Sequence, residues 1–227
     1  MGSRYNQMRA VLCLVVVIAM SCMQIRLVSA TDPDPLLDNP LNVTSFTLRD
    51  IFVNGDVSSG PGGVRAALNT RNFPGTTSEG LTVVRFEMVP CGVNVPHTHP
   101  RATELLSLIS GGPLQVGFID TAGNTHLDII RPGDSTLFPR ALLHFEINLG
   151  TENATYISAL NSQNPGTLNA AASLFRVPEL TLATALNTEF SVLKKIAESI
   201  SPALATLQKS SKAHCVPGQF GLLHPST

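Results

Sequence analysis

The most informative segment of this chain reads Pro96-His97-Thr98-His99-Pro100-Arg101-Ala102-Thr103-Glu104. Side chains on a β-strand alternate between its two faces, so His97 and His99 can point their imidazole rings toward one position. A short turn at Pro100 would let Glu104 return toward that position from the start of the next strand. The segment therefore predicts two strands joined by a turn, with three polar side chains converging.

A fourth polar side chain, His144, follows about forty residues later in the segment Leu142-Leu143-His144-Phe145-Glu146-Ile147-Asn148. It would join the other three from a neighbouring strand. Three neutral imidazoles and one carboxylate form a divalent metal site with positions left for water or substrate. A single His-x-His pair can also arise by accident on a surface or in a core. The glycines and prolines around both segments favour the metal site.

Residues 96–104 and 133–145 resemble the paired motifs of the cupin superfamily, and most closely those of plant germins and germin-like proteins. The resemblance extends from about residue 32 to the C-terminal part of the chain. It implies a mainly β, single-domain jelly-roll barrel with short C-terminal α-helices. It also implies that His97, His99, Glu104 and His144 bind manganese, and that the protein forms homo-oligomers, as trimers or hexamers.

The chain departs from this family pattern in three places. Cys91-Gly92 stands where the family usually has two glycines, and Ala141 stands where it usually has one. The family usually has a disulfide near the mature N-terminus, but this chain has no pair of cysteines there to form it. None of these departures removes a predicted ligand, but the first two leave the geometry of the loops open.

The first thirty residues have the pattern of a secretory signal peptide. Arg4 and Arg9 precede an apolar run at residues 10–23, and Val28-Ser29-Ala30 is a plausible cleavage site. The run is shorter than the roughly 20 residues that span a membrane, although an uncleaved anchor is the alternative. We therefore expect a secreted protein of the extracellular space, that is, of the apoplast or cell wall.

The composition of the chain after the predicted signal peptide excludes some classes of function. The leader holds three arginines and no acids, which leaves 12 basic and 16 acidic residues. Because acidic residues outnumber basic ones, the chain does not have the basic character that nucleic-acid binding calls for. Cys91 and Cys215 remain after the leader, and export permits a disulfide, but both pairing and two free thiols stay open. Asn42 and Asn153 begin sequons and are candidate glycan acceptors.

Periodicity predicts the order of elements. Short apolar segments between turn residues predict strands at residues 81–89, 105–109, 114–119, 126–130, 136–138, 144–148 and 154–160, which is typical of a sandwich or small barrel. Leu193, Ile196, Ala197 and Ile200 follow helical spacing. The predicted order is a signal peptide (1–30), an N-terminal arm with short strands (31–75), the barrel with its metal site (76–177), helices for oligomerisation (178–212) and a tail (213–227).

The site predicts redox chemistry on a small molecule or ion. Superoxide dismutation needs only a redox metal and a gap for an anion, whereas oxalate oxidation needs groups that orient a dicarboxylate. Asn94 could hydrogen-bond a metal-bound ligand, or it could be an ordinary turn residue. In the cereal oxalate oxidases that the chain resembles, two asparagines hold the substrate; one matches Asn94, and the other falls at Val84. We therefore expect a manganese superoxide dismutase, with oxalate oxidase or a non-catalytic manganese-binding storage or interaction module as alternatives.

Overall fold

The computed structural model describes residues 38, 42–200, 207–210 and 215–219. The predicted signal peptide lies outside these residues, as do His214 and His224. Within the described part of the chain, no helix is both long enough and apolar enough to cross a membrane.

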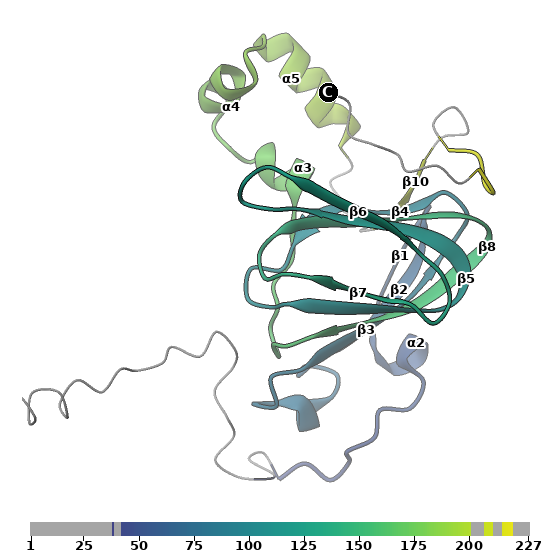
Figure 1. Cartoon of the computed structure of the whole chain (residues 1–227). Helices are drawn as coiled ribbons and strands as arrows, with labels where there is room; N and C mark the ends of the chain where they lie inside the picture. Colours follow the sequence, from purple (N-terminus) through teal and green to yellow (C-terminus); the bar gives the residue numbers. More distant parts are fainter. Residues whose placement is uncertain (1–37, 39–41, 201–206, 211–214, 220–227) are drawn as a thin grey trace, which may run out of the picture. The chain divides into compact units, whose positions relative to one another are not determined.

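The described strands form one curled sheet, which Figure 1 shows rolled into a barrel. The strands are β1 (Asp56–Gly60), β2 (Gly63–Leu68), β3 (Thr82–Met88), β4 (Gly92–Thr98), β5 (Glu104–Ile119), β6 (Thr125–Ile130), β7 (Ser135–Phe138), β8 (Leu143–Leu160), β9 (Leu168–Asn169) and β10 (Leu207–Lys209). All pairings between the described strands are antiparallel, as expected for strands that alternate buried and exposed residues. The mainly β fold class predicted from the sequence is confirmed.

Two strands are longer than the sequence predicted. Residues 105–109 and 114–119 belong to the single strand β5, and residues 144–148 and 154–160 belong to β8. Gly111 and Gly112 have positive φ angles of 71° and 80°, but the ladder with β8 continues past them with shifts of register. These glycines therefore bend one strand rather than end it, because a bulge lets a strand curve while its partner keeps pairing.

The barrel interior is filled by side chains from β3, β5 and β8. Along β3, alternate residues are buried, and Phe86 stacks on Tyr156 of β8 with ring centroids 4.4 Å apart. Strands β1 and β2, from the segment predicted as an N-terminal arm, are hydrogen-bonded into the same sheet through β3. Two short elements flank them: the helix α2 (Ile51–Asn54) and a 3₁₀ turn (Pro74–Thr76).

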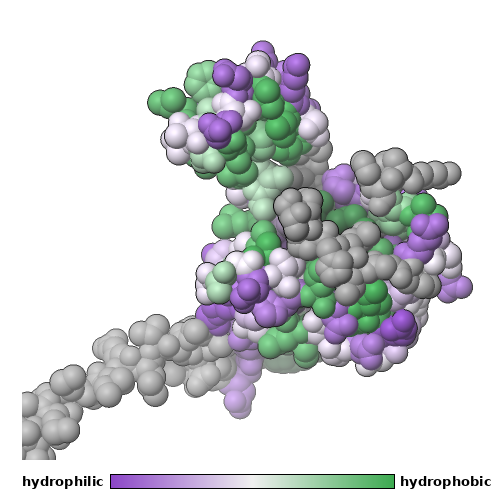
Figure 2. All heavy atoms as spheres, turned by 45° about the horizontal axis from the view of Figure 1, so that its top comes forward, coloured by the Kyte–Doolittle hydropathy of each residue, from purple (hydrophilic) through white to green (hydrophobic). Residues whose placement is uncertain are grey.

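Three short helices follow the barrel strands: α3 (Ala170–Leu174), α4 (Glu179–Leu186) and α5 (Phe190–Ser199). Leu182, Ala183 and Leu193 form a small core between α4 and α5, with Phe175 packed against it. Several other apolar side chains of these helices, such as Leu180, are exposed, and Figure 2 shows apolar surface among polar side chains on this part of the chain. The segment predicted to be helical up to residue 212 also contains a strand, β10, which pairs with β4.

Candidate metal centre

Strand pairing brings the histidines together. In the ladder between β4 and β8, His97 lies directly opposite His144, and Asn94 lies opposite Glu146. An irregularity between Asn94 and His97 changes the register, so the two histidines face the barrel interior together. Glu104 is the first residue of β5 and pairs with both β7 and β8. Four polar side chains thus meet at one end of the barrel.

The four predicted ligands form a compact group. One ligand atom from each of His97, His99, Glu104 and His144 lies within 4.8 Å of the others. Oε2 of Glu104 is 3.1 Å from Nε2 of His99 and 3.3 Å from Nε2 of His144. Three of the residues are buried, and His99 is half-buried at the mouth of the group. This spacing suits one ion coordinated by all four side chains.

Backbone carbonyl groups orient each ring. Nδ1 of His97 is 2.9 Å from the carbonyl oxygen of Val95, and Nδ1 of His144 is 2.8 Å from that of Leu142. Nδ1 of His99 is 2.6 Å from the carbonyl oxygen of Gly166. A carbonyl only accepts, so each Nδ1 carries the proton and each neutral ring turns the lone pair of Nε2 toward the group. This arrangement is the usual support for metal-bound histidines.

The resulting collection of acceptors fits a cation. Burial, reinforced by the charges of His144 and His99, lowers the pKa of His97 to about 3, so its ring is neutral at physiological pH. Oε2 of Glu104 and Nε2 of His144 are buried without a hydrogen-bond partner. Three lone pairs and a carboxylate at this spacing repel one another unless a cation lies between them.

A small cavity of about 60 Å³ adjoins the four side chains. It is lined by His97, His99 and Glu104 together with Asn94, Val84 and other residues of β2, β3 and β8. Asn94 is buried, and its Oδ1 atom has no hydrogen-bond partner. Its carboxamide therefore lies where it can reach a ligand in the cavity. Val84 is buried beside Phe86 and contributes only apolar surface.

Two further titratable side chains lie in the interior, and the sequence did not single them out. Burial raises the pKa of Glu146 well above its ordinary value, and the charge of Glu104 raises it further, while Asn94 opposes the change. Burial likewise raises the pKa of Tyr156, as does the charge of Glu146. Alternation along β8 could have placed Glu146 on the same face as His144, two residues earlier. Burial of this carboxyl group therefore disfavours its ionised form.

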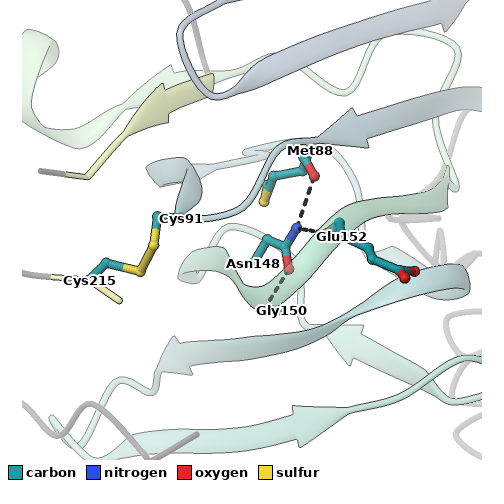
Figure 3. Close-up of a disulfide and its surroundings, with 6 residues drawn as sticks. All are labelled: Met88, Cys91, Asn148, Gly150, Glu152 and Cys215. Atoms are coloured by element: carbon teal, nitrogen blue, oxygen red, sulfur yellow. Dashed lines mark hydrogen bonds between the residues drawn. A yellow bond between two sulfur atoms is a disulfide. The ribbon is translucent and has the colours of Figure 1, made fainter. Parts of the chain in front are cut away.

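The loop that precedes β4 is held from several sides. A disulfide joins Cys91 to Cys215, with Cα atoms 5.9 Å apart, and thereby settles the pairing that the sequence left open. The backbone N–H of Cys91 donates to the carbonyl of Asn148, 2.9 Å away. The Asn148 carboxamide donates to the carbonyl groups of Met88 and Glu152 and accepts from Gly150, as Figure 3 shows beside the disulfide. Asn148 is thus structural.

The two positions where glycine is usual in the family keep a glycine-like backbone. Cys91 has a φ angle of 59° and Ala141 a φ angle of 62°, both in the left-handed region that is costly for side chains with a Cβ atom. The N–H of Ala141 donates to the carbonyl of His99, 3.1 Å away. The loop that precedes His144 therefore keeps the left-handed turn, and this turn is bonded to the segment that carries His99.

The other predicted sites lie away from this group. His126 is half-exposed, stacks on Phe118 and lies 2.9 Å from Asp120. Asn42 and Asn153, which begin the two sequons, are both exposed, as glycosylation requires. Arg65, which lines the small cavity, was not singled out from the sequence. Its position on an inward-facing site of β2 depends on strand register, which the sequence does not reveal.

Comparison with known proteins agrees with this geometry. Residues 50–195 match the family described as Cupin. The chain is 35% identical over 211 residues to germin-like protein subfamily 2 member 2 of Arabidopsis thaliana, covering 84% of this chain and 96% of that protein. It is 36% identical over 168 residues to the rhicadhesin receptor of Pisum sativum, covering 70% of this chain and 77% of that protein.

A solved structure shares the fold as well. An oxalate oxidase in complex with the substrate analogue glycolate superposes with a TM-score of 0.67 at 28% identity, over 76% of this chain and all of that one. The barrel and its inward-facing group of three histidines and a glutamate are those of a cupin with a candidate metal site. Within that class, the chain belongs to the germin-like proteins, and the predicted family is confirmed.

Proposed function

We propose that this protein is a secreted manganese enzyme that converts superoxide to oxygen and hydrogen peroxide in the extracellular space. The observation that carries the proposal is the group of three histidines and one glutamate beside a cavity of about 60 Å³. A cavity of that size accommodates an anion of a few atoms or one or two water molecules. The disulfide is in keeping with export to an oxidising compartment.

Each residue of the site has a role in this proposal. His97, His99, Glu104 and His144 would bind manganese, with their rings oriented by the carbonyl groups of Val95, Gly166 and Leu142. A mixed nitrogen and oxygen ligand set with open positions suits manganese or iron better than a closed structural zinc site. When bound, the metal supplies the redox chemistry by alternating between two oxidation states.

The chain's own groups around the cavity orient the anion and exclude bulk water. The Asn94 side chain is buried at the cavity wall, and its unpartnered Oδ1 could accept a hydrogen bond from a protonated ligand or a water molecule in the cavity. Val84, Phe86 and Leu160 provide the apolar part of the wall. In a dry cavity each polar contact to an anion is stronger than it is in water.

Oxalate oxidation is the second catalytic candidate, because a similar structure is that of an oxalate oxidase. Against it, the residue at position 84 is valine and offers no hydrogen bond, and an unmade bond at such a position costs about 1–3 kcal/mol. A non-catalytic role is the third candidate. One relative is named a receptor, which favours testing whether the manganese-loaded protein acts as an interaction module.

The experiment uses the secreted full-length product, with the metal content measured by elemental analysis and superoxide and oxalate assays run on the same sample. We expect about one manganese per chain, superoxide dismutation and little hydrogen peroxide from oxalate. His99→Ala should lose both the metal and the activity. His126→Ala is the matched control, since it removes an imidazole that lies outside the group.

Three results would overturn the proposal in different ways. Full metal content in His99→Ala would contradict the assignment of this group as the metal site. Hydrogen peroxide production from oxalate, if it depends on His99, would identify oxalate rather than superoxide as the substrate. Failure of both assays on fully loaded oligomers would leave the non-catalytic interaction module.

A further inference from the structure

A positively charged side chain, Arg65, lines the cavity beside the candidate metal ligands. Arg65 is on β2, directly opposite Phe86 of β3, and Phe86 faces the barrel interior. Directly opposed residues of neighbouring strands project from the same face of a sheet, so Arg65 belongs to the inward face. By contrast, Arg85 of β3 is exposed and lies over the ring of Phe52.

The two cavities of this region share Arg65. The small cavity beside the metal ligands has a volume of about 60 Å³, and a larger outer cavity has about 760 Å³. Both are lined by Arg65, Val84, His99, Leu160 and Thr167. These five residues therefore lie where the two cavities adjoin, and among them only Arg65 carries a permanent charge.

Arg65 remains charged in these surroundings. Burial lowers the pKa of Arg65 from its ordinary value, the nearby charge of Asp56 opposes that change, and a guanidinium remains protonated in proteins. Asp56 lines the outer cavity and is paired with Arg71 at 2.7 Å. A guanidinium has five N–H donors in a planar fork that matches two oxygens of one anion.

We infer that Arg65 is the anion-binding residue of the metal cavity, where it selects a small anion that shares its charge between two oxygen atoms and positions it beside the metal ligands. This inference rests on the proposed function for the location of the reacting site, but it names the ligand chemistry and the residue that recognises it. Superoxide and small carboxylates share this chemistry. Arg65 also supplies charged donors to a cavity in which Val84 supplies none.

The test measures anion binding separately from catalysis. Formate is titrated into the manganese-loaded, full-length protein, and its dissociation constant is followed through the electron paramagnetic resonance spectrum of the metal. Arg65→Gln should weaken formate binding at least tenfold, and Arg65→Lys should restore part of it, because a lysine keeps the charge but not the fork. Asp56→Asn should tighten binding, since it removes the negative charge beside Arg65.

The matched control is Arg85→Gln, which makes the same change in charge on the outer face of the sheet. It should leave formate binding within twofold of the wild-type value. In the superoxide assay, Arg65→Gln should lower kcat/KM and weaken its dependence on ionic strength, because a steering charge acts on association. A purely structural arginine would change folding without changing this salt dependence.

The outcomes separate this inference from the proposed function. If formate binding depends on Arg65 but superoxide is not consumed, the anion site stands and its ligand is a carboxylate. If superoxide is consumed and Arg65→Gln changes neither formate binding nor salt dependence, the inference is wrong although the enzyme assignment stands. Should Arg65→Gln fail to fold, unchanged formate affinity in Asp56→Asn would contradict the inference by itself.

Discussion

The barrel interior and the α4–α5 helix pair differ in what each leaves unsatisfied. Inside the barrel, polar atoms of Asn94, Glu104 and His144 are buried without partners. On the helices, apolar side chains such as Phe190 and Ile196 are 48% and 41% exposed. Buried polar atoms call for a ligand or ion, and exposed apolar side chains call for another apolar surface. The two regions therefore need partners of opposite chemistry.

The two regions also differ in how firmly they are held. Of the candidate metal ligands, His97, Glu104 and His144 lie on paired strands and His99 directly follows β4. Each ring is bonded to a carbonyl group, and a disulfide closes the neighbouring loop. The helix pair has a core of only Leu182, Ala183 and Leu193, with Phe175 beside it. We therefore expect the barrel to keep its geometry without a partner chain, and the helix pair to depend on one.

The largest expected effect tests how the barrel is held. The Cys91–Cys215 disulfide closes a loop with a sequence separation of 124 residues, and removing such a bond costs about 3–5 kcal/mol. Cys215→Ser should lower the free energy of unfolding by that amount in urea titrations. A cost below about 1 kcal/mol would show that strand pairing alone holds the metal loop.

The next effect tests the helix pair. We propose that its exposed apolar side chains pack against another copy of the chain in a trimer or hexamer. Ile196→Asp would bury an unpaired charge there, which should raise the dissociation constant of the oligomer by about a hundredfold. Sedimentation or light scattering measures the change. Lys195→Asp, which adds an acid at the neighbouring exposed position, is the control, and a monomeric wild type at micromolar concentration would contradict the proposal.

A smaller effect comes from pH and concerns the metal-free barrel. The pKa of His97 is about 3 in the folded protein against an ordinary value of 6.5, so between these values the unfolded chain binds a proton that the folded chain does not. Stability therefore decreases as pH falls through this window. We expect a loss of about 1–2 kcal/mol between pH 6.5 and 5.

The pH measurement needs its own control, because Glu146 contributes with the opposite sign. Its pKa is raised in the folded state, so above its ordinary value of 4.5 the folded chain holds a proton that the unfolded chain has lost. Comparing the free energies of unfolding of the wild type and His97→Gln at each pH isolates the contribution of His97. Parallel curves for the two proteins would show that His97 is not the residue responsible.

The smallest effect concerns the loop before His144. Ala141 has a φ angle of 62°, which an alanine adopts at a cost and a glycine adopts freely. Ala141→Gly should therefore raise the free energy of unfolding by about 1 kcal/mol. Thermal unfolding of the metal-free protein measures it, and a decrease in stability would show that the loop does not require the left-handed backbone.

Much of this site could be predicted because its signals are local. The spacing of His97, near the end of β4, and His99, directly after it, depends only on nearby residues, as does the turn that precedes Glu104. Other features were missed because they depend on pairing between distant segments. The sequence predicted two strands, at residues 105–109 and 114–119, with turn residues between them. Continued pairing with β8 instead makes Gly111-Gly112 a bend within β5. Arg65 acquired its position in the same way, through the pairing of β2 with β3, whereas alternation along β8 could have revealed Glu146.

The sequence by itself determined the β-rich class, the four candidate ligands and the helical spacing of the C-terminal segment, because strand alternation and helical period follow from backbone geometry. Only the tertiary structure decided that Cys91 bonds Cys215, that Asn148 supports the loop and that Arg65 faces the metal cavity. These outcomes depend on the register of strands that lie far apart in the chain. A shift of one residue would turn Arg65 to the outer face and leave the cavity without its charge.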